Sequence, residues 1–273
     1  MENANVSKTR RLVECAMFVA IATVLSIIKL AELPYGGSIT VASMLPIVMI
    51  AYRHGLGWGL GSGVVFGAIQ QLLGLKNLSY VTTWQSVLAV IMLDYIVAFT
   101  VIGFGGMFRK SESRGAALAA GSAVACLLRY ICHVISGATV WAGLSIPTKA
   151  ALLYSLAYNA TYMIPETIVL VVAAYYLGSI FDLKAGNPTR VAREKTGGAV
   201  FRLIAGLILA GMVVFDTVMV FSKLQDGESG EFYIKGLVDV SWLAVGIVTG
   251  ACVVLSVALF VISKKSKAAV EPE

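Results

Sequence analysis

Residues 129–166 read RYICHVISGATVWAGLSIPTKAALLYSLAYNATYMIPE, two apolar runs joined by a short loop. The stretch is apolar enough to lie in a membrane, yet it contains His133, Trp141, Asn159, Glu166 and several tyrosines. Polar and ionisable groups cost free energy in hydrocarbon, so they are kept there mainly where they contact a ligand or one another. The stretch therefore predicts membrane-spanning helices that enclose a binding site.

The composition of the whole chain favours a membrane protein. The 273 residues are 58% hydrophobic and only 13% charged, and the mean hydropathy is +0.85. These values are typical of a multi-span membrane protein and disfavour a soluble one. The first apolar run, residues 12–30, has no small-residue cleavage site followed by a soluble domain, so we expect it to be retained rather than removed as a signal peptide.

Apolar runs define the predicted helices. Most of them reach the roughly 20 residues that cross about 30 Å of hydrocarbon as a helix. The run over residues 39–52 is short and contains Pro46, which favours a kinked or partly re-entrant helix, although we count it as a span. We predict an all-α, polytopic membrane protein, with a six-helix bundle and two additional C-terminal transmembrane helices. The eight apolar runs are 11–30, 39–52, 56–75, 84–108, 115–143, 151–181, 200–221 and 238–262.

A polar stretch, DLKAGNPTRVAREKTGG from residue 182, separates the first six runs from the last two. Gly, Pro and charged residues in such a stretch are typical of a linker between domains. We predict a six-helix binding unit over residues 1–185, a cytoplasmic linker over 186–199 and a two-helix extension over 200–273.

Lysine and arginine are distributed unevenly between the loops on the two sides of the predicted spans. Fifteen lie at the termini and in one set of loops, and five lie in the other set. Positive residues concentrate on the cytoplasmic side, so we predict a multi-pass protein of the plasma membrane with both termini in the cytoplasm. The formal net charge of +6 needs no nucleic-acid partner, because basic loops face anionic lipid head groups.

Metal, cofactor and catalytic chemistry find little support in the sequence. The four cysteines lie in apolar runs without C-x-x-C spacing, and the two histidines do not complete a zinc or haem site. No Walker A motif is present, so ATP-driven transport needs a partner. An intramembrane enzyme using Asp94, His133 and Glu166 as acid and base lacks a nucleophile with an adjacent base. We predict a protein that is not an enzyme and holds no metal or cofactor.

The spacing of His133, Gly137 and Trp141 places an imidazole, a missing side chain and an indole on one face of a helix. This face is typical of a slot for a flat ligand. Asp94 supplies a negative charge, and Asn159 supplies a donor and an acceptor. An indole face attracts an organic cation by about 0.5–2 kcal/mol. The expected ligand is planar, heteroaromatic and cationic.

Four motifs occur in order within about the first 185 residues: PYGGSITVASMLPI at 34–47, LDYIVAF at 93–99, H-x3-G-x3-W at 133–141 and YNATYMIPE at 158–166. In these motifs the chain resembles the thiamine-specific substrate-binding component, or S component, of energy-coupling factor transporters. The resemblance implies a six-helix membrane protein that captures thiamine from outside. It also implies delivery inward when the protein is docked on a transmembrane coupling protein and two ATPases.

The resemblance further implies roles for individual residues. Trp141 would stack on a thiamine ring, and His133 and Asn159 would form hydrogen bonds to the ligand. Gly137 would leave room for the ligand, and Tyr154 would line the pocket.

The same resemblance assigns the cationic thiazolium to the neighbouring pair Asp94 and Tyr95. The family often has Glu where this chain has Asp94, so the contact of the shorter carboxylate is left open. A tryptophan that the family can carry after the first span is absent, and Tyr35 is the nearest aromatic candidate for a lid. Trp84 is either a lid residue or an anchor in the aromatic belt of the membrane.

Ala16 and Ala20 in the first run form a small-x3-small stripe that allows another helix to approach closely. In similar S components such a pattern meets the coupling protein, so the resemblance implies docking here.

Two alternatives stay open at this stage. A self-sufficient secondary transporter or channel for a small heteroaromatic cation would usually show repeated halves, and no internal repeat is visible.

Arg129 is expected to neutralise a buried carboxylate, either that of Glu166 or that of Asp94.

Overall fold

The computed structural model describes most of the chain, namely residues 7–33, 36–144, 146, 148–191, 199–224 and 234–268. The chain divides into two compact units, residues 1–191 and residues 192–273.

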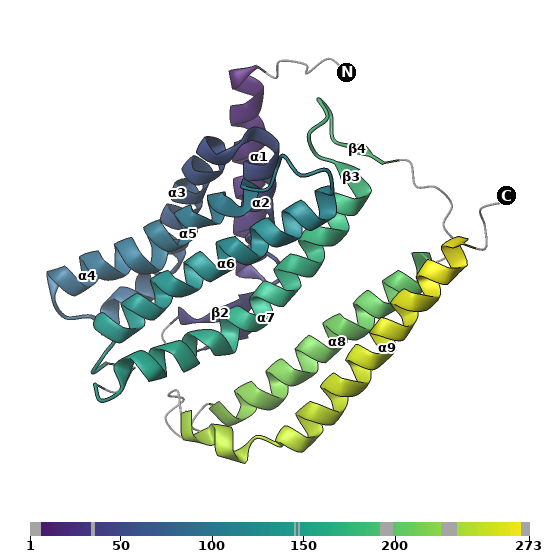
Figure 1. The fold of residues 1–273 in the computed structure, drawn as a ribbon. Coiled ribbons are helices and arrows are strands. Elements are labelled where there is room, and N and C mark those ends of the chain that lie inside the picture. The colour runs from purple at the N-terminus through teal and green to yellow at the C-terminus, as the bar shows by residue number, and fades with distance from the viewer. Residues whose placement is uncertain are drawn as a thin grey trace. The chain divides into compact units, whose positions relative to one another are not determined.

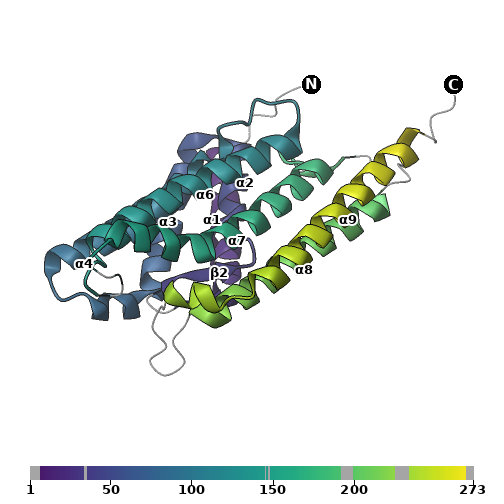
Figure 2. The same cartoon turned by 60° about the horizontal axis from the view of Figure 1, so that its bottom comes forward.

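The first unit is a helical bundle with two short β-hairpins (Figures 1 and 2). The helical segments are α1 (Lys8–Ile27), α2 (Leu45–His54), α3 (Leu56–Leu73), η2 (Leu75–Tyr80), α4 (Trp84–Val90), η3 (Ile91–Val97), α5 (Ala98–Thr100), η4 (Val101–Gly106), α6 (Arg114–Thr139) and α7 (Ala151–Ile180). The antiparallel hairpins are β1 (Lys29–Glu32) with β2 (Ser38–Thr40), and β3 (Phe181–Asp182) with β4 (Thr189–Arg190). α6 and α7 lie side by side, and α2 and α3 pack against each other and against η4.

The second unit contains two long helices, α8 (Ala199–Leu224) and α9 (Trp242–Ala268), and the short 3-10 helix η5 (Ile234–Asp239). α8 and α9 lie side by side (Figure 1). The Thr249 hydroxyl of α9 donates a hydrogen bond to Asp216 of α8 at 2.8 Å. This bond gives a carboxylate within an apolar helix a polar partner on the neighbouring helix.

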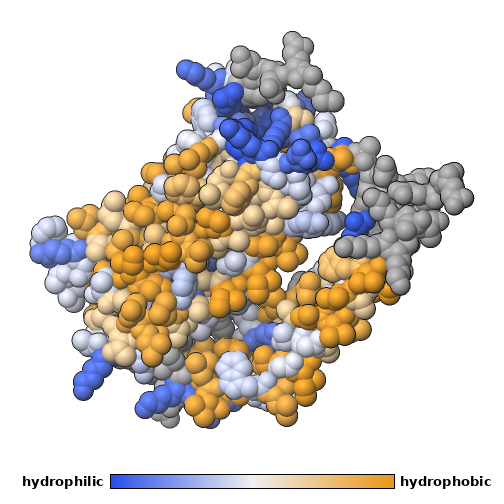
Figure 3. Space-filling view, in the orientation of Figure 1, coloured by the Kyte–Doolittle hydropathy of each residue, from blue (hydrophilic) through white to orange (hydrophobic). Residues whose placement is uncertain are grey.

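The structure confirms an all-α, polytopic membrane protein. Six helices in the described ranges are long and apolar enough to cross a membrane: Leu56–Leu73, Trp84–Gly106, Arg114–Thr139, Ala151–Ile180, Ile204–Leu224 and Trp242–Ser263. Hydrophobic side chains cover the flanks of the first unit, and hydrophilic ones gather at the end where α1 begins and β3–β4 lies (Figure 3). The first four of these helices form the six-helix bundle together with α1 and α2.

The helix in the predicted span over residues 39–52 is shorter than expected, although the segment still runs from β1, after the end of α1, back to Glu14 near the start of α1. Residues 38–40 form β2, and α2 has only 10 residues, about 15 Å of helix at 1.5 Å per residue. Pro46 lies at the start of α2, where its missing N–H costs nothing. Gly55 ends the helix with a φ of +99°, a conformation that favours glycine. Both residues therefore limit α2 to about half the thickness of the hydrocarbon.

The first predicted span has the expected length but begins and ends three residues earlier, since α1 covers Lys8–Ile27. α1 ends at Ile27, and Lys29 begins a strand whose pairing with β2 continues to Glu32. The backbone groups after Ile27 are thus satisfied by the hairpin instead of by further helical turns.

The predicted span over residues 84–108 changes its winding along its length. α4 is followed by a π-helical segment, η3, then by α5 and the 3-10 winding of η4. Short π segments within helices are frequent at functional sites. Gly67 of α3 allows a close approach here, because a Cβ at this position would lie 2.7 Å from the Tyr95 carbonyl oxygen. α3 therefore packs directly on the segment that carries Asp94 and Tyr95.

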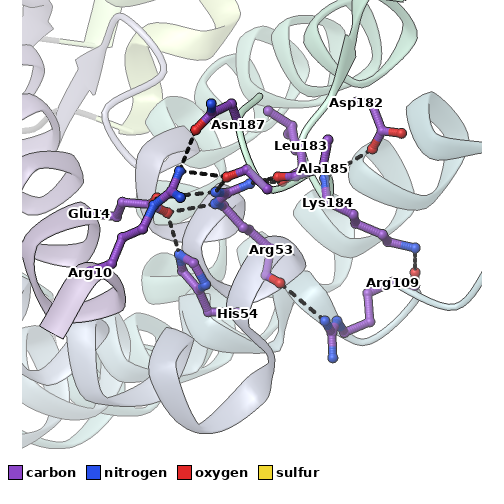
Figure 4. Close-up of polar contacts among 11 residues, drawn as sticks. Arg10, Glu14, Arg53, His54, Arg109, Asp182, Leu183, Lys184, Ala185 and Asn187 are labelled. Carbon is purple, nitrogen blue, oxygen red and sulfur yellow. Dashed lines mark hydrogen bonds and ion pairs between the residues drawn. The ribbon is translucent and has the colours of Figure 1, made fainter. Parts of the chain in front are cut away.

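A polar cluster near the start of α1 joins this helix to α2 and to the β3–β4 connection (Figure 4). Arg53 donates to the Glu14 carboxylate at 2.6 Å, and His54 Nε2 lies 2.8 Å from the same oxygen. Arg53 also donates to the carbonyl oxygens of Leu183 and Ala185 at 2.5 and 2.7 Å. Its side chain is only 4% exposed, so these acceptors compensate a buried guanidinium.

Candidate functional site

A cavity in the first unit brings together most of the predicted binding residues. Its volume is about 440 Å³, within the range of small-molecule sites. The end of α1, the β1–β2 hairpin, the α3–η2 junction, η3, α6 and α7 all contribute to its wall. The predicted residues that line it are Asp94, Tyr95, His133, Gly137, Trp141 and Asn159.

The Asp94 carboxylate is the shared acceptor of a hydrogen-bond network in this wall. Its Oδ1 lies 2.9 Å from His133 Nδ1. Its Oδ2 accepts from the Ser136 hydroxyl at 2.6 Å and from the Trp141 indole N–H at 3.0 Å. These bonds join Asp94 to residues that lie 39 to 47 positions further along the sequence. The carboxylate and the indole that were expected to act on one ligand are in direct contact.

The contact with Asp94 involves one nitrogen of His133, Nδ1, and leaves the other, Nε2, without this partner. A carboxylate that accepts this hydrogen bond takes it from the Nδ1–H group. Nε2 of a neutral imidazole is then an acceptor. This atom is buried and has no hydrogen-bond partner among the described residues, in a side chain that lines the cavity.

The Asn159 amide is already bonded within the protein. Its Nδ2 donates to the Ser155 carbonyl at 2.9 Å and to the His133 carbonyl at 3.3 Å. Its Oδ1 accepts from the Tyr162 hydroxyl at 2.6 Å. Asn159 thus connects α7 to α6 and orients Tyr162. Its Nδ2 can donate to a ligand only if one of these bonds is exchanged, whereas Oδ1 has a second lone pair.

Gly137 borders the cavity, but the space that its missing side chain leaves is not free. A Cβ at this position would lie 2.2 Å from Ser155 Oγ and 3.4 Å from Asn159 Nδ2. The expectation of a gap for the ligand is therefore corrected: the glycine lets α7 approach α6 closely. Its effect on the site is indirect, because this approach places Asn159 and Tyr162 in the wall.

Tyr95 and Tyr154 differ in their relation to the cavity. The Tyr95 hydroxyl accepts from Asn77 Nδ2 at 2.8 Å, and both residues line the wall. Tyr154 is half-buried in the first turn of α7 and is not part of the lining. Tyr158 and Tyr162, one and two turns further along the same helix, contribute instead.

Of the two candidate lid residues, only Trp84 is described by the structure, and it does not line the cavity. Trp84 is 71% exposed at the first residue of α4. This position agrees better with an anchor in the aromatic belt than with a lid. Tyr35 lies outside the described residues.

A buried ion pair forms another part of the wall. Arg129 of α6 donates to Glu166 of α7 at 2.8 Å, and their side chains are 10% and 2% exposed. The Thr40 hydroxyl donates to the second oxygen of Glu166 at 2.8 Å. Of the two pairings considered for Arg129, the one with Glu166 is confirmed. Asp94 takes other partners.

Exposed charged residues mark where the cavity opens to solvent. Lys29 and Lys76 donate to the same oxygen of Glu32 at 2.7 and 3.2 Å, and all three residues line the cavity. The Lys29 ammonium lowers the pKa of the Glu32 carboxyl below its ordinary value, against the opposing effect of burial. Glu32 therefore stays charged at neutral pH and holds β1 to η2.

Ser136, Thr40 and Asn77 also belong to the site or its support, and the sequence did not predict them. Ser136 lies one turn after His133 in an apolar helix, and a hydroxyl in that position is a usable signal. Thr40 and Asn77 come from a hairpin and a 3-10 helix. No apolar periodicity predicted these elements, so no pattern pointed to the two residues.

Comparisons with known proteins converge on one family. The model of the family described as thiamine transporter protein matches residues 12–183. The thiamine transporter ThiT of Bacillus subtilis (strain 168) is 36% identical over 171 residues, which are 58% of this chain and 85% of that relative. ThiT of Lacticaseibacillus paracasei is 27% identical over 153 residues, which are 52% of this chain and 70% of that relative.

A solved structure of ThiT from Listeria monocytogenes is similar in fold to this chain. The TM-score is 0.53 at 25% sequence identity, over 63% of this chain and 94% of that one. The match to the family model ends before α8 begins. Since this model covers more than half of the chain, and since the fold agrees as well, the chain belongs to the thiamine transporter protein family, whose members are membrane transporters and not enzymes.

Proposed function

We propose that the chain is the membrane-embedded thiamine-binding subunit of an energy-coupling factor importer. One observation carries this proposal: a carboxylate, an indole and an imidazole whose Nε2 has no partner among the described residues meet in the wall of one cavity. Thiamine joins a permanently cationic thiazolium to an aminopyrimidine. Such a ligand needs a negative charge, an aromatic face and an acceptor for its amino group.

Each binding residue has a proposed role within this cavity. Trp141 stacks on a ring of thiamine, and Asp94 with Tyr95 compensates the thiazolium charge. His133 Nε2 accepts from the amino group of the pyrimidine. Asn159 forms a hydrogen bond to the ligand. The following roles complete the proposal: Gly137 in helix packing beside the ligand, Tyr154 near the entrance, Tyr35 as the lid candidate and Trp84 as an anchor in the aromatic belt.

The orientation in the membrane follows from the positive-inside rule. We place both termini in the cytoplasm and the opening of the cavity at Lys29, Glu32 and Lys76 outside the plasma membrane. Within the chain, residues 1–185 form the thiamine-binding unit, 186–199 a cytoplasmic linker and 200–273 an accessory two-helix extension in contact with membrane lipid.

Docking to the coupling protein is proposed for the exposed face of α1. Ala16 and Ala20 are both exposed, and Val13, Met17 and Val24 beside them are 52%, 60% and 59% exposed. Small side chains within an apolar face allow another helix to approach closely. The two ATPase subunits then supply the energy, since the sequence contains no Walker A motif.

Thiamine binding and transport are separable in this proposal. We expect the purified chain to bind thiamine in titration calorimetry, and vesicles containing only this chain to accumulate none. Accumulation is expected when the coupling protein and the ATPases are added with ATP. Uptake by the chain alone would favour a self-sufficient secondary transporter or channel instead, and failure to bind thiamine would contradict both interpretations.

Replacing Trp141 with alanine is expected to weaken thiamine binding at least tenfold, about 1.4 kcal/mol, because a ring contact and a donor to Asp94 are lost together. Titration calorimetry and quenching of tryptophan fluorescence measure the effect. Trp84→Ala is the matched control, since Trp84 lies outside the cavity lining. Equal affinities of the two variants would mean that Trp141 does not contact the ligand.

A further inference from the structure

Ser136 lies behind the cavity wall rather than in it. Its side chain is fully buried at 0% exposure, and it is not among the residues that line the cavity. Its hydroxyl nevertheless makes the shortest of the three contacts to the Asp94 carboxylate, at 2.6 Å. Ser136 can therefore influence a ligand only through other residues.

The Asp94 carboxylate is nearly saturated by the protein. A carboxylate offers about four lone-pair positions, two on each oxygen. Ser136 and Trp141 both donate to Oδ2, and His133 contacts Oδ1. The orientation of the carboxylate thus decides where the indole and the imidazole lie, and Ser136 is the donor that no ligand displaces.

Ser136 is joined to Trp141 by a second route. The Ser136 carbonyl oxygen accepts from the backbone N–H of Val140 at 2.7 Å and of Trp141 at 3.3 Å, where α6 ends. Ser136 therefore contacts the backbone of Trp141 directly and its indole through the Asp94 carboxylate. Removing only the hydroxyl leaves the backbone contacts in place, so a substitution can isolate the contact with the carboxylate.

We propose that Ser136 is a positioning residue for ligand binding: its hydroxyl fixes the Asp94 carboxylate, which in turn holds the rings of Trp141 and His133 in their binding orientation. The inference rests on the proposed thiamine site. A fixed carboxylate needs no reorganisation when the ligand arrives, and such preorganisation is a principal source of affinity.

Ser136→Ala is expected to weaken thiamine binding about tenfold, the typical effect of a lost hydrogen bond to a charged group. The fluorescence of Trp141 in the ligand-free protein should also change, because its indole N–H loses a fixed acceptor. Ser122→Ala is the matched control, since Ser122 lies on the same helix at 0% exposure and its hydroxyl has no partner among the described residues. It should leave affinity and fluorescence unchanged.

A double-mutant cycle with Asp94→Asn separates positioning from general destabilisation. If Ser136 acts through the carboxylate, Ser136→Ala changes the affinity by less than twofold in the Asp94→Asn background. A tenfold loss in both backgrounds would overturn the inference, as would a Ser136→Ala protein that binds thiamine as tightly as the parent. Failure of the proposed function is a different result, because then the parent protein itself does not bind thiamine.

Discussion

Uptake of thiamine is expected to fall to background when Ala16 and Ala20 are both replaced by tryptophan, while thiamine binding is retained. The two residues lie one turn apart on α1, and both are exposed. Two indoles would hold a partner helix away from this face, because close helix contacts in membranes depend on small side chains. Uptake is measured in vesicles that contain the coupling protein and the ATPases, and binding by titration calorimetry.

The chain offers a matched control for this experiment. Ala116 and Ala120 have the same spacing and are exposed on α6. Replacing both with tryptophan introduces the same bulk on another helix, and we expect uptake near that of the parent. Normal uptake by the Ala16→Trp, Ala20→Trp variant would remove the docking proposal, and so would equal loss in both variants.

Replacing Arg129 with alanine is expected to lower the free energy of unfolding by about 3–5 kcal/mol, the usual cost of breaking a buried ion pair from one side. The Glu166 side chain, 2% exposed, would be left with the Thr40 hydroxyl but without a counter-charge. Glu166→Ala should cost a similar amount, because it strands the guanidinium. Unfolding of the protein in detergent, followed by circular dichroism, gives the measurement.

We expect this loss of stability to come from the unpaired buried charge and not from the lost side-chain volume. The double variant Arg129→Met, Glu166→Leu removes both charges and keeps most of the volume, so it should recover most of the lost stability. Arg190→Ala, at an exposed position of β4, should change stability by less than about 0.5 kcal/mol. A single variant at Arg129 that is as stable as this control would contradict the argument.

Several features of the fold follow from local patterns in the sequence. Apolar runs of about 20 residues can satisfy their backbone in hydrocarbon only as helices, which predicted the segments that became α3, α6 and α7. Helical periodicity predicted His133, Gly137 and Trp141 on one face of a single helix, and this was wrong for Trp141. α6 ends at Thr139, so Trp141 lies just beyond the helix. The pairing of Arg129 with Glu166 was one of two alternatives, and only the packing of α6 on α7 decided between them.

Other features depend on contacts between distant segments. The length of α2 and the two hairpins are set by backbone pairing and by Gly55, which hydropathy does not report. Gly137 was expected to make space, yet the space is filled by Ser155 of α7. The π-helical winding of η3, against Gly67 of α3, also has no signal in the periodicity of one segment.

The sequence by itself determined that this protein crosses a membrane as a helical bundle, and which polar residues lie within that bundle. Both results depend on the cost of exposing polar groups to hydrocarbon, a cost that is read residue by residue. Only the tertiary structure decided which of these polar groups meet. Asp94 is bonded to Trp141, Ser136 and His133, and Arg129 to Glu166, because hydrogen bonds between helices depend on how the helices pack.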